Sequence, residues 1–297
     1  MWNSIKSLDR ILRGDATRLS DLRRGTLDVP LGGLSLVILV LGAFYGACMG
    51  VYAVVTRHGT DSAVAGYQQL GASAVKVPML FFLTLIVTFP SLYVFNALMG
   101  SRLSLPALLR LLIASLGVMM ALLASFGTIA VFFAVSTDSY SFMVLLNVVL
   151  FAVAGFLGLG FLLQTLHRLF NAQIVVPIHS LSEIPHTPDP NVPPPPPQVA
   201  PEYPEPGALD TLEGQVSSRN VRTVFRIWVL VFGLVGAQTG WVLRPFIGDP
   251  SKPFTFFRER QSNFFEGVVR TTGRLLSGEP AKKGGNWHQS PSKPASR

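Results

Sequence analysis

The chain has 297 residues, of which 49% are hydrophobic and only 13% are charged. Soluble globular domains carry about 25% charged residues, so this composition excludes a soluble enzyme, a disulfide-stapled secreted domain and an ordinary nucleic-acid binder. Apolar runs longer than about 18 residues recur and predict membrane spans. The sequence therefore predicts an all-α integral membrane protein with about five transmembrane helices, two interfacial amphipathic helices and a proline-rich linker.

The positive charge of the chain is concentrated near its two ends. The sequence carries 24 lysines and arginines against 16 aspartates and glutamates, a net charge of +8. Because both basic regions adjoin apolar runs, we interpret them as contacts with anionic membrane lipids rather than with nucleic acid. The single cysteine, Cys48, lies in an apolar run and excludes an intramolecular disulfide.

Residues 1–30 form the first region, a cytosolic amphipathic basic segment. Trp2, Ile5, Leu8 and Ile11 recur at helical spacing, with lysines and arginines on the other faces. Tryptophan and basic residues on one short helix are typical of helices at the membrane interface. The alternative is a solvated helix that packs on the rest of the protein.

Residues 31–170 are predicted to form a four-helix transmembrane bundle. Its first span carries Gly42, Gly46 and Gly50 one turn apart, a spacing that lets another helix approach closely. The sequence leaves open whether that helix belongs to this chain or to another. Residues 56–76, which follow the first span, are interpreted as a polar loop.

The second span covers residues 77–99 and carries Pro90 near its middle. A proline inside a helix removes a backbone hydrogen bond, so the sequence predicts a kink there. A short hinge leads to a third span over residues 107–135, and a fourth follows over residues 142–166. Gly155 and its neighbouring glycines give the fourth span a second face for helix packing.

Residues 171–222 are interpreted as a proline-rich cytosolic linker. Twelve prolines fall between residues 177 and 206, and five are consecutive: Pro193, Pro194, Pro195, Pro196 and Pro197. Such segments adopt an extended polyproline II helix, which docks on aromatic grooves of partner proteins at low entropic cost. We interpret the run as a candidate partner-binding site, with a stiff spacer as the alternative.

The last apolar segment, residues 223–248, is predicted to be a fifth transmembrane helix, and its apolar run, residues 227–243, is short for a span. Gly236 and Gly240 give it a glycine face for helix packing. Residues 249–278 repeat phenylalanine and arginine at close to helical spacing and are interpreted as an amphipathic interfacial segment. Residues 279–297, rich in Lys, Gly, Pro and Ser, are expected to be disordered.

Charge asymmetry sets the predicted orientation. Residues 1–30 hold six lysines and arginines, and the positive-inside rule places them and the proline-rich linker in the cytoplasm, with the spans in a bacterial cytoplasmic (inner) membrane. Five spans would put the C-terminal tail outside, although the region after residue 243 holds ten Lys and Arg against four Asp and Glu. The alternative is that the fifth segment re-enters without crossing.

The sequence shows no constellation for catalysis or metal binding. None of its five histidines pairs with a glutamate or a second histidine at metal-ligand spacing, and no nucleophile elbow, P-loop or dinucleotide fingerprint is present. We therefore expect no enzymatic activity, no metal and no cofactor. The predicted spans also hold no carboxylate, which weighs against a proton-coupled carrier.

A few polar side chains fall within or beside the spans. Asn147 and Gln238 lie inside the fourth and fifth spans, and we interpret both as helix-packing groups rather than pore lining. Lys76 and Arg110 lie near predicted helix ends, from which long basic side chains reach the membrane interface.

Three segments carry a family resemblance: residues 76–101 (KVPMLFFLTLIVTFPSLYVFNALMGS), 137–163 (TDSYSFMVLLNVVLFAVAGFLGLGFLL) and 236–248 (GAQTGWVLRPFIG). Together they resemble an uncharacterised family of bacterial multi-pass membrane proteins. Some of these proteins carry the name of an actin-binding WH2 domain, whose LKKT-like tetrad is absent from this sequence. The five-span layout is also loosely similar to Yip1-type proteins, without their DLYGP segment. Neither resemblance implies a site residue.

We therefore expect a non-enzymatic inner-membrane protein, a scaffold or organiser of a membrane complex that acts through helix packing and lipid contact. Membrane lipids are its expected partners. A soluble protein at the proline-rich linker and a second copy of the chain are further candidates. The alternative from another class is a small-solute channel or carrier, in which Pro90 and the short fifth segment form the moving part.

Overall fold

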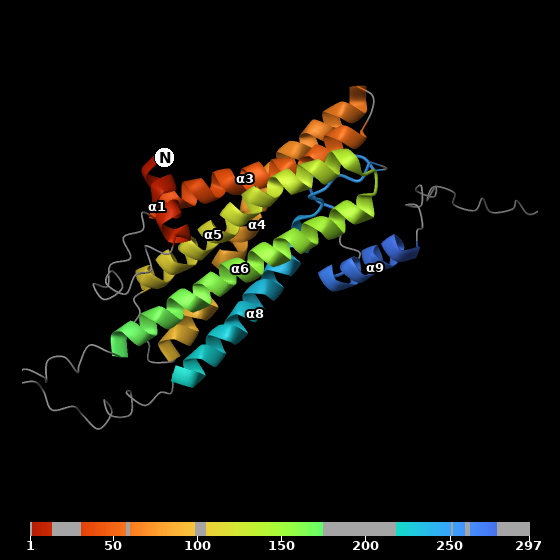
Figure 1. Cartoon of the computed structure of the whole chain (residues 1–297). Coiled ribbons are helices and arrows are strands. Elements are labelled where there is room, and N and C mark those ends of the chain that lie inside the picture. The colour runs from red at the N-terminus through yellow and green to blue at the C-terminus, as the bar shows by residue number, and fades with distance from the viewer. Residues whose placement is uncertain are drawn as a thin grey trace, which may run out of the picture.

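The computed structural model of the chain describes residues 2–13, 31–57, 60–98, 105–174, 218–250, 252–258 and 262–277. Within these ranges every regular element is an α-helix and no strand occurs (Figure 1). The seven helices are α1 (Trp2–Leu12), α3 (Leu31–Thr56), α4 (Thr60–Leu98), α5 (Leu105–Ser136), α6 (Tyr140–Ile174), α8 (Ser218–Leu243) and α9 (Phe264–Ser277). The predictions for residues 14–30, Pro193–Pro197 and 279–297 lie outside the described residues.

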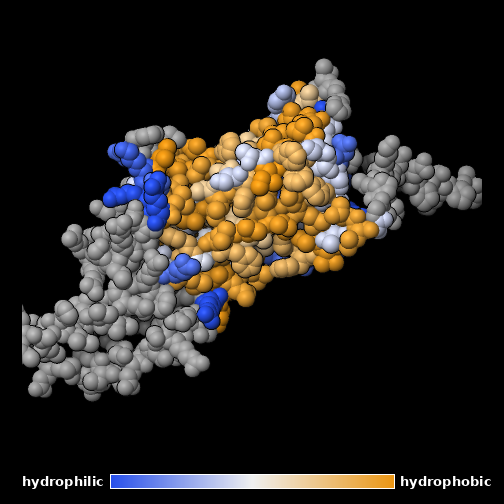
Figure 2. Space-filling view, in the orientation of Figure 1, coloured by the Kyte–Doolittle hydropathy of each residue, from blue (hydrophilic) through white to orange (hydrophobic). Residues whose placement is uncertain are grey.

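Five of these helices are long and apolar enough to cross a membrane. Their candidate spans are Leu31–Thr56, Ala63–Val94, Leu108–Ser136, Tyr140–Thr165 and Arg226–Leu243. The helices lie side by side as an elongated bundle (Figure 1), and apolar side chains cover the middle of the face shown in Figure 2. The predicted class, an all-helical protein with five candidate membrane spans, is confirmed. The fifth lies within one unbroken helix, α8.

The structure differs from the predicted loop at residues 56–76. α4 begins at Thr60 and runs for 39 residues, so only residues 57–59 separate it from α3. At 1.5 Å per residue the helix is about 58 Å long, well beyond the ~30 Å hydrocarbon core of a bilayer. The polar residues that suggest a loop belong to a helix face that binds another part of the chain, as described below.

Glycines bring α3 and α4 into backbone contact. A Cβ atom on Gly50 would lie 2.5 Å from the Cα atom of Leu70, and one on Gly42 would lie 3.2 Å from the Cβ atom of Pro78. Gly46 is tighter still, because a Cβ atom there would fall on the backbone of α4. The sequence leaves the partner of this glycine face open, and the structure places it in the same chain.

α4 stays helical through Pro90, where the sequence predicts a kink. A proline has no N–H group, so one backbone hydrogen bond is lost at this turn. The hydroxyl of Thr88 donates to the carbonyl of Thr84 at 2.7 Å. The indole of Trp228 on α8 donates to the Thr88 carbonyl (3.4 Å) and to Ser91 Oγ (3.2 Å). The Thr88 hydroxyl and the indole of Trp228 therefore contact α4 on both sides of the proline.

The glycines of α6 and α8 have different surroundings. Among the described residues, nothing lies within 4 Å of a Cβ atom built on Gly155. A Cβ atom on Gly158, three residues further, would lie 2.9 Å from the Cβ atom of Met119 on α5. Gly158 therefore makes the close contact of α6. On α8, Gly236 and Gly240 face α4, with side-chain atoms 3.6 Å and 3.8 Å from their Cβ positions.

α1 packs on the bundle through one face. Leu8 and Ile11 are buried against α3 and α5, and a Cβ atom on Gly117 would lie 3.1 Å from Leu8 Cδ1. Ile5 and Leu12 are exposed. Packing on the rest of the protein, one of the two predicted alternatives, therefore accounts for Leu8 and Ile11, whereas Ile5 and Leu12 lie on the surface.

Candidate functional site

A segment without regular secondary structure joins α8 to α9 and folds against the helix ends. We call residues 244–258 the capping segment; of these, residue 251 lies outside the described ranges. Figure 1 shows it as the blue trace beside the end of the bundle where α3 ends and α4 begins. Its two ends are joined by the backbone N–H of Arg258, which donates to the carbonyl of Arg244 at 3.2 Å. Carbonyl groups between them accept hydrogen bonds from side chains of α4 and from Arg57, the residue after α3.

Three polar side chains on one face of α4 hold the capping segment. Gln69, Ser73 and Lys76 are spaced four and three residues apart, so they line up along the helix. Gln69 Nε2 donates to the carbonyls of Pro245 (3.0 Å) and Phe246 (2.9 Å). Ser73 Oγ also donates to the carbonyl of Phe246. These bonds satisfy backbone groups that burial would otherwise leave without partners.

Lys76 is fully buried, with 0% of its surface exposed. Its ammonium donates to the carbonyls of Pro245 (3.1 Å) and Phe256. The rings of Phe256 and Phe257 lie with their centres 4.5 Å and 5.4 Å from Nζ, within the range of cation–π attraction. The sequence predicts that Lys76 reaches the interface from a helix end. It lies instead well inside α4 and points into the protein, because the capping segment supplies its partners.

Arg57, the residue after α3, binds the middle of the capping segment. Its Nη2 donates to the carbonyls of Asp249 and Lys252, each 3.0 Å away, and only 8% of its surface is exposed. Burial lowers the pKa of the Arg57 guanidinium. Arginine nevertheless stays protonated in proteins, so Arg57 brings a permanent positive charge into the site.

Trp241, near the end of α8, attaches α9 to the bundle. The guanidinium of Arg244 lies 4.0 Å from the centre of its ring, and Phe264 meets the ring edge-on at 6.4 Å. The indole N–H of Trp241 donates to the carbonyl of Ser262. Gly267 of α9 lies so close to the ring that no side chain fits between them. Burial also lowers the pKa of Arg244.

The two predicted intramembrane amides have different surroundings. Asn147 is buried, accepts a hydrogen bond from the hydroxyl of Tyr45 on α3 (2.9 Å) and donates to the carbonyl of Met143 (2.8 Å). This is the geometry of a helix-packing group. Gln238 is half-buried on α8 and makes no hydrogen bond to any part of the chain that the structure describes.

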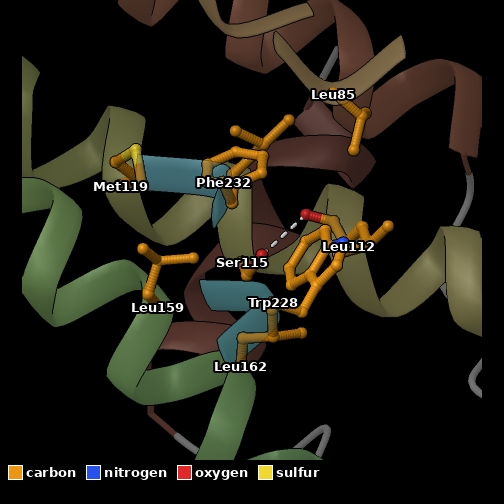
Figure 3. A pocket seen from close by; sticks show the side chains of 9 residues that line it. Leu85, Leu112, Ser115, Met119, Leu159, Leu162, Trp228 and Phe232 are labelled. Atoms are coloured by element: carbon orange, nitrogen blue, oxygen red, sulfur yellow. Dashed lines mark hydrogen bonds between the residues drawn. The ribbon is translucent and has the colours of Figure 1, made fainter. Parts of the chain in front are cut away.

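An apolar cavity lies between α4, α5, α6 and α8 (Figure 3). Its lining residues are Leu85, Leu112, Ser115, Leu116, Met119, Leu159, Leu162, Trp228 and Phe232. The volume open to a water-sized sphere is about 10 Å³, at the lower limit for holding one water molecule. The hydroxyl of Ser115 is already bonded to the Leu112 carbonyl at 2.8 Å. The cavity is therefore too small for a solute.

The contacts around the capping segment are those that hold a chain segment in place. Among the residues that the structure describes, no group of three or more His, Cys, Asp and Glu side chains could hold a metal ion. The capping segment brings together cationic side chains, backbone carbonyls and phenylalanine rings. Such an arrangement fixes a chain segment and concentrates positive charge.

No family model, curated protein or solved structure matches this chain. The resemblance to bacterial multi-pass membrane proteins therefore stays a prediction from three sequence segments. In the structure the first segment begins in α4, the second overlaps α6, and the third runs from α8 into the capping segment.

Sequence reasoning does not predict that Arg57, Gln69 and Ser73 bind the capping segment together with Lys76. The available signal is the spacing of the three α4 residues, which puts them on one helix face. Their partners are backbone carbonyls 169 to 195 residues further along the chain. Every residue has a carbonyl, so the sequence does not distinguish these acceptors.

Proposed function

We propose that this protein is a non-enzymatic scaffold of a bacterial cytoplasmic (inner) membrane, which organises a membrane complex through helix packing and lipid contact. The observation that carries the proposal is the attachment of a short helix, α1 or α9, at each end of the five-helix bundle (Figure 1). α1 packs on α3 and α5, and α9 packs on α6 and α8. A bundle held in this way contacts both leaflets of a bilayer.

Both attached helices combine exposed apolar residues with basic ones. The exposed apolar residues are Ile5 and Leu12 on α1 and Phe265, Val269, Leu275 and Leu276 on α9. The basic residues are Lys6 and Arg10 on α1 and Arg270 and Arg274 on α9. Apolar and basic residues on one short helix favour the boundary between head groups and acyl chains, with the basic groups on anionic lipids.

The proposed orientation has the α1 end of the bundle in the cytoplasm, as the positive-inside rule favours. α6 ends and α8 begins at this same end (Figure 1), so the proline-rich linker between them joins the bundle there. A soluble protein that binds the run Pro193–Pro197 is the proposed partner of the scaffold. A second copy of the chain is another candidate contact.

The alternative, a small-solute channel or carrier, has less support. Asn147 is bonded to Tyr45 rather than lining a path, and the cavity between the helices has room for about one water molecule. Lys76 and Gln69 likewise donate to a carbonyl of the capping segment rather than lining a path.

A topology map tests the proposal. In a Cys48→Ala background, single cysteines replace Tyr203 in the linker and Trp287 in the tail, and a membrane-impermeant thiol reagent is added to intact cells. The scaffold proposal expects protection at 203 and labelling at 287. Protection at both positions would put the tail in the cytoplasm, contradict five crossings and move the channel alternative to first place.

A second experiment tests the partner role of the linker. Cross-linked membranes containing the full chain are compared with membranes in which a Gly–Ser run of equal length replaces Pro193–Pro197. The proposal expects a reproducible set of cross-linked proteins that shrinks on replacement. An unchanged set of cross-linked proteins would indicate that the proline run is a spacer.

A further inference from the structure

The fifth candidate span is both the least buried and the least apolar of the five. Only 17% of the residues in Arg226–Leu243 are buried, against 28–50% in the other four spans, and its mean hydropathy is the lowest. α8 lies at the edge of the bundle (Figure 1) and packs mainly on α4. The less apolar a membrane helix is, the less it gains from contact with lipid, so the most polar span is expected to be well covered by protein. The side of α8 that this chain leaves uncovered is therefore a candidate contact surface.

Large apolar residues at helical spacing form the uncovered side of α8. Ile227, Leu230 and Leu234 follow one another at intervals of three and four residues, and all three are exposed. Trp241, seven residues after Leu234, continues the same side, but there it contacts Phe264 of α9. The uncovered part therefore ends before Trp241. We call Ile227, Leu230, Leu234 and Gln238 the open α8 face.

Gln238 adds an amide group to this face. It follows Leu234 by four residues, is half-buried and makes no hydrogen bond to any part of the chain that the structure describes. It lies five residues before the end of the span, and helix side chains lean toward the N-terminus, which here is toward the middle of the bilayer. An amide without a partner in hydrocarbon costs free energy, so Gln238 is expected to bond to a polar group outside the described chain.

We propose that the open α8 face is the contact between two copies of this chain, related by a two-fold axis along the membrane normal. Copies of one chain insert in the same orientation, so the two α8 helices run parallel and carry Gln238 at the same depth. A two-fold contact uses the same surface on both copies. A glutamine amide fits such a contact because it both donates and accepts hydrogen bonds, so the two Gln238 side chains bond to each other.

Small residues beside the open α8 face let the two helices approach. Among the described residues, nothing lies within 4 Å of a Cβ atom built on Gly233, and Ala237 follows it by one turn. Small residues one turn apart are typical of the contacts between membrane helices. The contact rests on the proposed membrane placement of α8, and it gives the second copy of the chain a specific surface.

Disulfide cross-linking between identical positions tests the contact. In a Cys48→Ala background, a single cysteine replaces Leu230 or Leu234 on the open α8 face. The control is a single cysteine at Val153, an exposed residue near the middle of the fourth candidate span. Membranes that contain the full chain are oxidised, and the products are separated without reduction. The proposal expects a product of twice the mass of the chain from both α8 variants, in severalfold higher yield than from Val153→Cys.

Three outcomes of this experiment would overturn the proposal. Equal yields from α8 and from Val153→Cys would indicate random collisions in the membrane. A product whose mass differs from that of two copies would assign the open α8 face to another membrane protein. The absence of any product would leave the face to lipid.

A pair of matched variants tests the role of the amide. Gln238→Leu removes the amide from the open α8 face, and Gln164→Leu removes an exposed amide at the end of the fourth span. Energy transfer between labelled copies, diluted in liposomes, gives the dissociation constant of the dimer. Gln238→Leu is expected to raise it about 3- to 30-fold, the range for hydrogen bonds between membrane helices, and Gln164→Leu less than about twofold. Equal effects of the two variants would overturn the role of Gln238.

The unfolding midpoint separates loss of the dimer from loss of the fold. Gln238 has no hydrogen bond within the described chain, so Gln238→Leu is expected to keep the midpoint of the parent protein in a detergent that separates the copies. A lowered midpoint under these conditions would assign Gln238 to packing within one chain and overturn its place in the contact. The contact and the scaffold fail separately. The contact fails on the cross-links and dissociation constants, and the scaffold fails on the topology map.

Discussion

The ammonium of Lys76 and the carbonyl oxygen of Pro245 lie 3.1 Å apart, although 169 residues separate them in the chain. Lys76 belongs to the second candidate span, and Pro245 follows the fifth. Burying an ionisable side chain in a membrane costs free energy, so such residues are expected to face protein rather than lipid and to have partners. The partners of Lys76 are carbonyls of the capping segment, which fix the chain after the last span to the middle of α4.

Replacing Lys76 with methionine is therefore expected to release the capping segment. The side chain keeps much of its length but loses its donors. The Phe256 carbonyl then loses its donor and the Pro245 carbonyl keeps only Gln69, at a cost of about 1–3 kcal/mol of stability. The measurements are the thermal unfolding midpoint in detergent and the rate of tryptic cleavage at Arg258. Lys252→Met, on an exposed lysine of the same segment, is the control. Equal behaviour of the two variants would contradict a holding role for Lys76.

The glycines of α3 and α6 are predicted to respond to alanine with opposite signs. Gly46→Ala places a methyl group on the backbone of α4, and overpacking of this kind costs about 1–3 kcal/mol. Gly155→Ala meets open space and replaces a glycine inside a helix, which stabilises by about 0.5–1 kcal/mol. Unfolding midpoints of both variants in one detergent check the prediction. A loss of stability on Gly155→Ala would show that this glycine contacts something outside the chain.

The spans could be predicted from the sequence because they depend on local hydropathy. The start of α4 could not, because the polar residues Gln69, Ser73 and Lys76 are compatible with a loop until their partners are known. Those partners are carbonyls of the capping segment, more than 160 residues away. The sequence shows which positions are polar, and the fold determines what they face.

Glycine faces show a second limit of sequence reasoning. The evenly spaced Gly42, Gly46 and Gly50 all lie against α4, so their spacing alone identifies the contact face. On α6, Gly155 and Gly158 sit three residues apart within one apolar run, and only the position of α5 decides which of them touches a neighbour. Hydropathy and residue size do not contain that information.

The bond between Tyr45 and Asn147 is expected to stabilise the contact of α3 with α6 by about 0.6–2 kcal/mol, the range for polar pairs between membrane helices. Tyr45→Phe, Asn147→Leu and the double variant form a cycle whose coupling energy measures the pair. The same variants are tested for solute flux in liposomes. Flux that disappears with Asn147→Leu at unchanged stability would contradict the packing role and favour a channel.

Gly267 is predicted to be the residue that lets α9 attach to the bundle. Alanine at this position would collide with the ring of Trp241, which Arg244 and the Ser262 carbonyl hold from other sides. Gly273→Ala, on the same helix with nothing within 4 Å, is the matched control, because both variants gain the same helix propensity.

The measurement is tryptic cleavage of the purified protein at Arg270 and Arg274, both on α9. Gly267→Ala is expected to raise the cleavage rate severalfold, because a detached helix of 14 residues is only marginally stable on its own. Gly273→Ala is expected to leave the rate unchanged or lower it. If both variants are cleaved at the rate of the parent protein, the contact with Trp241 does not hold α9, and its attachment would have to come from α6 instead.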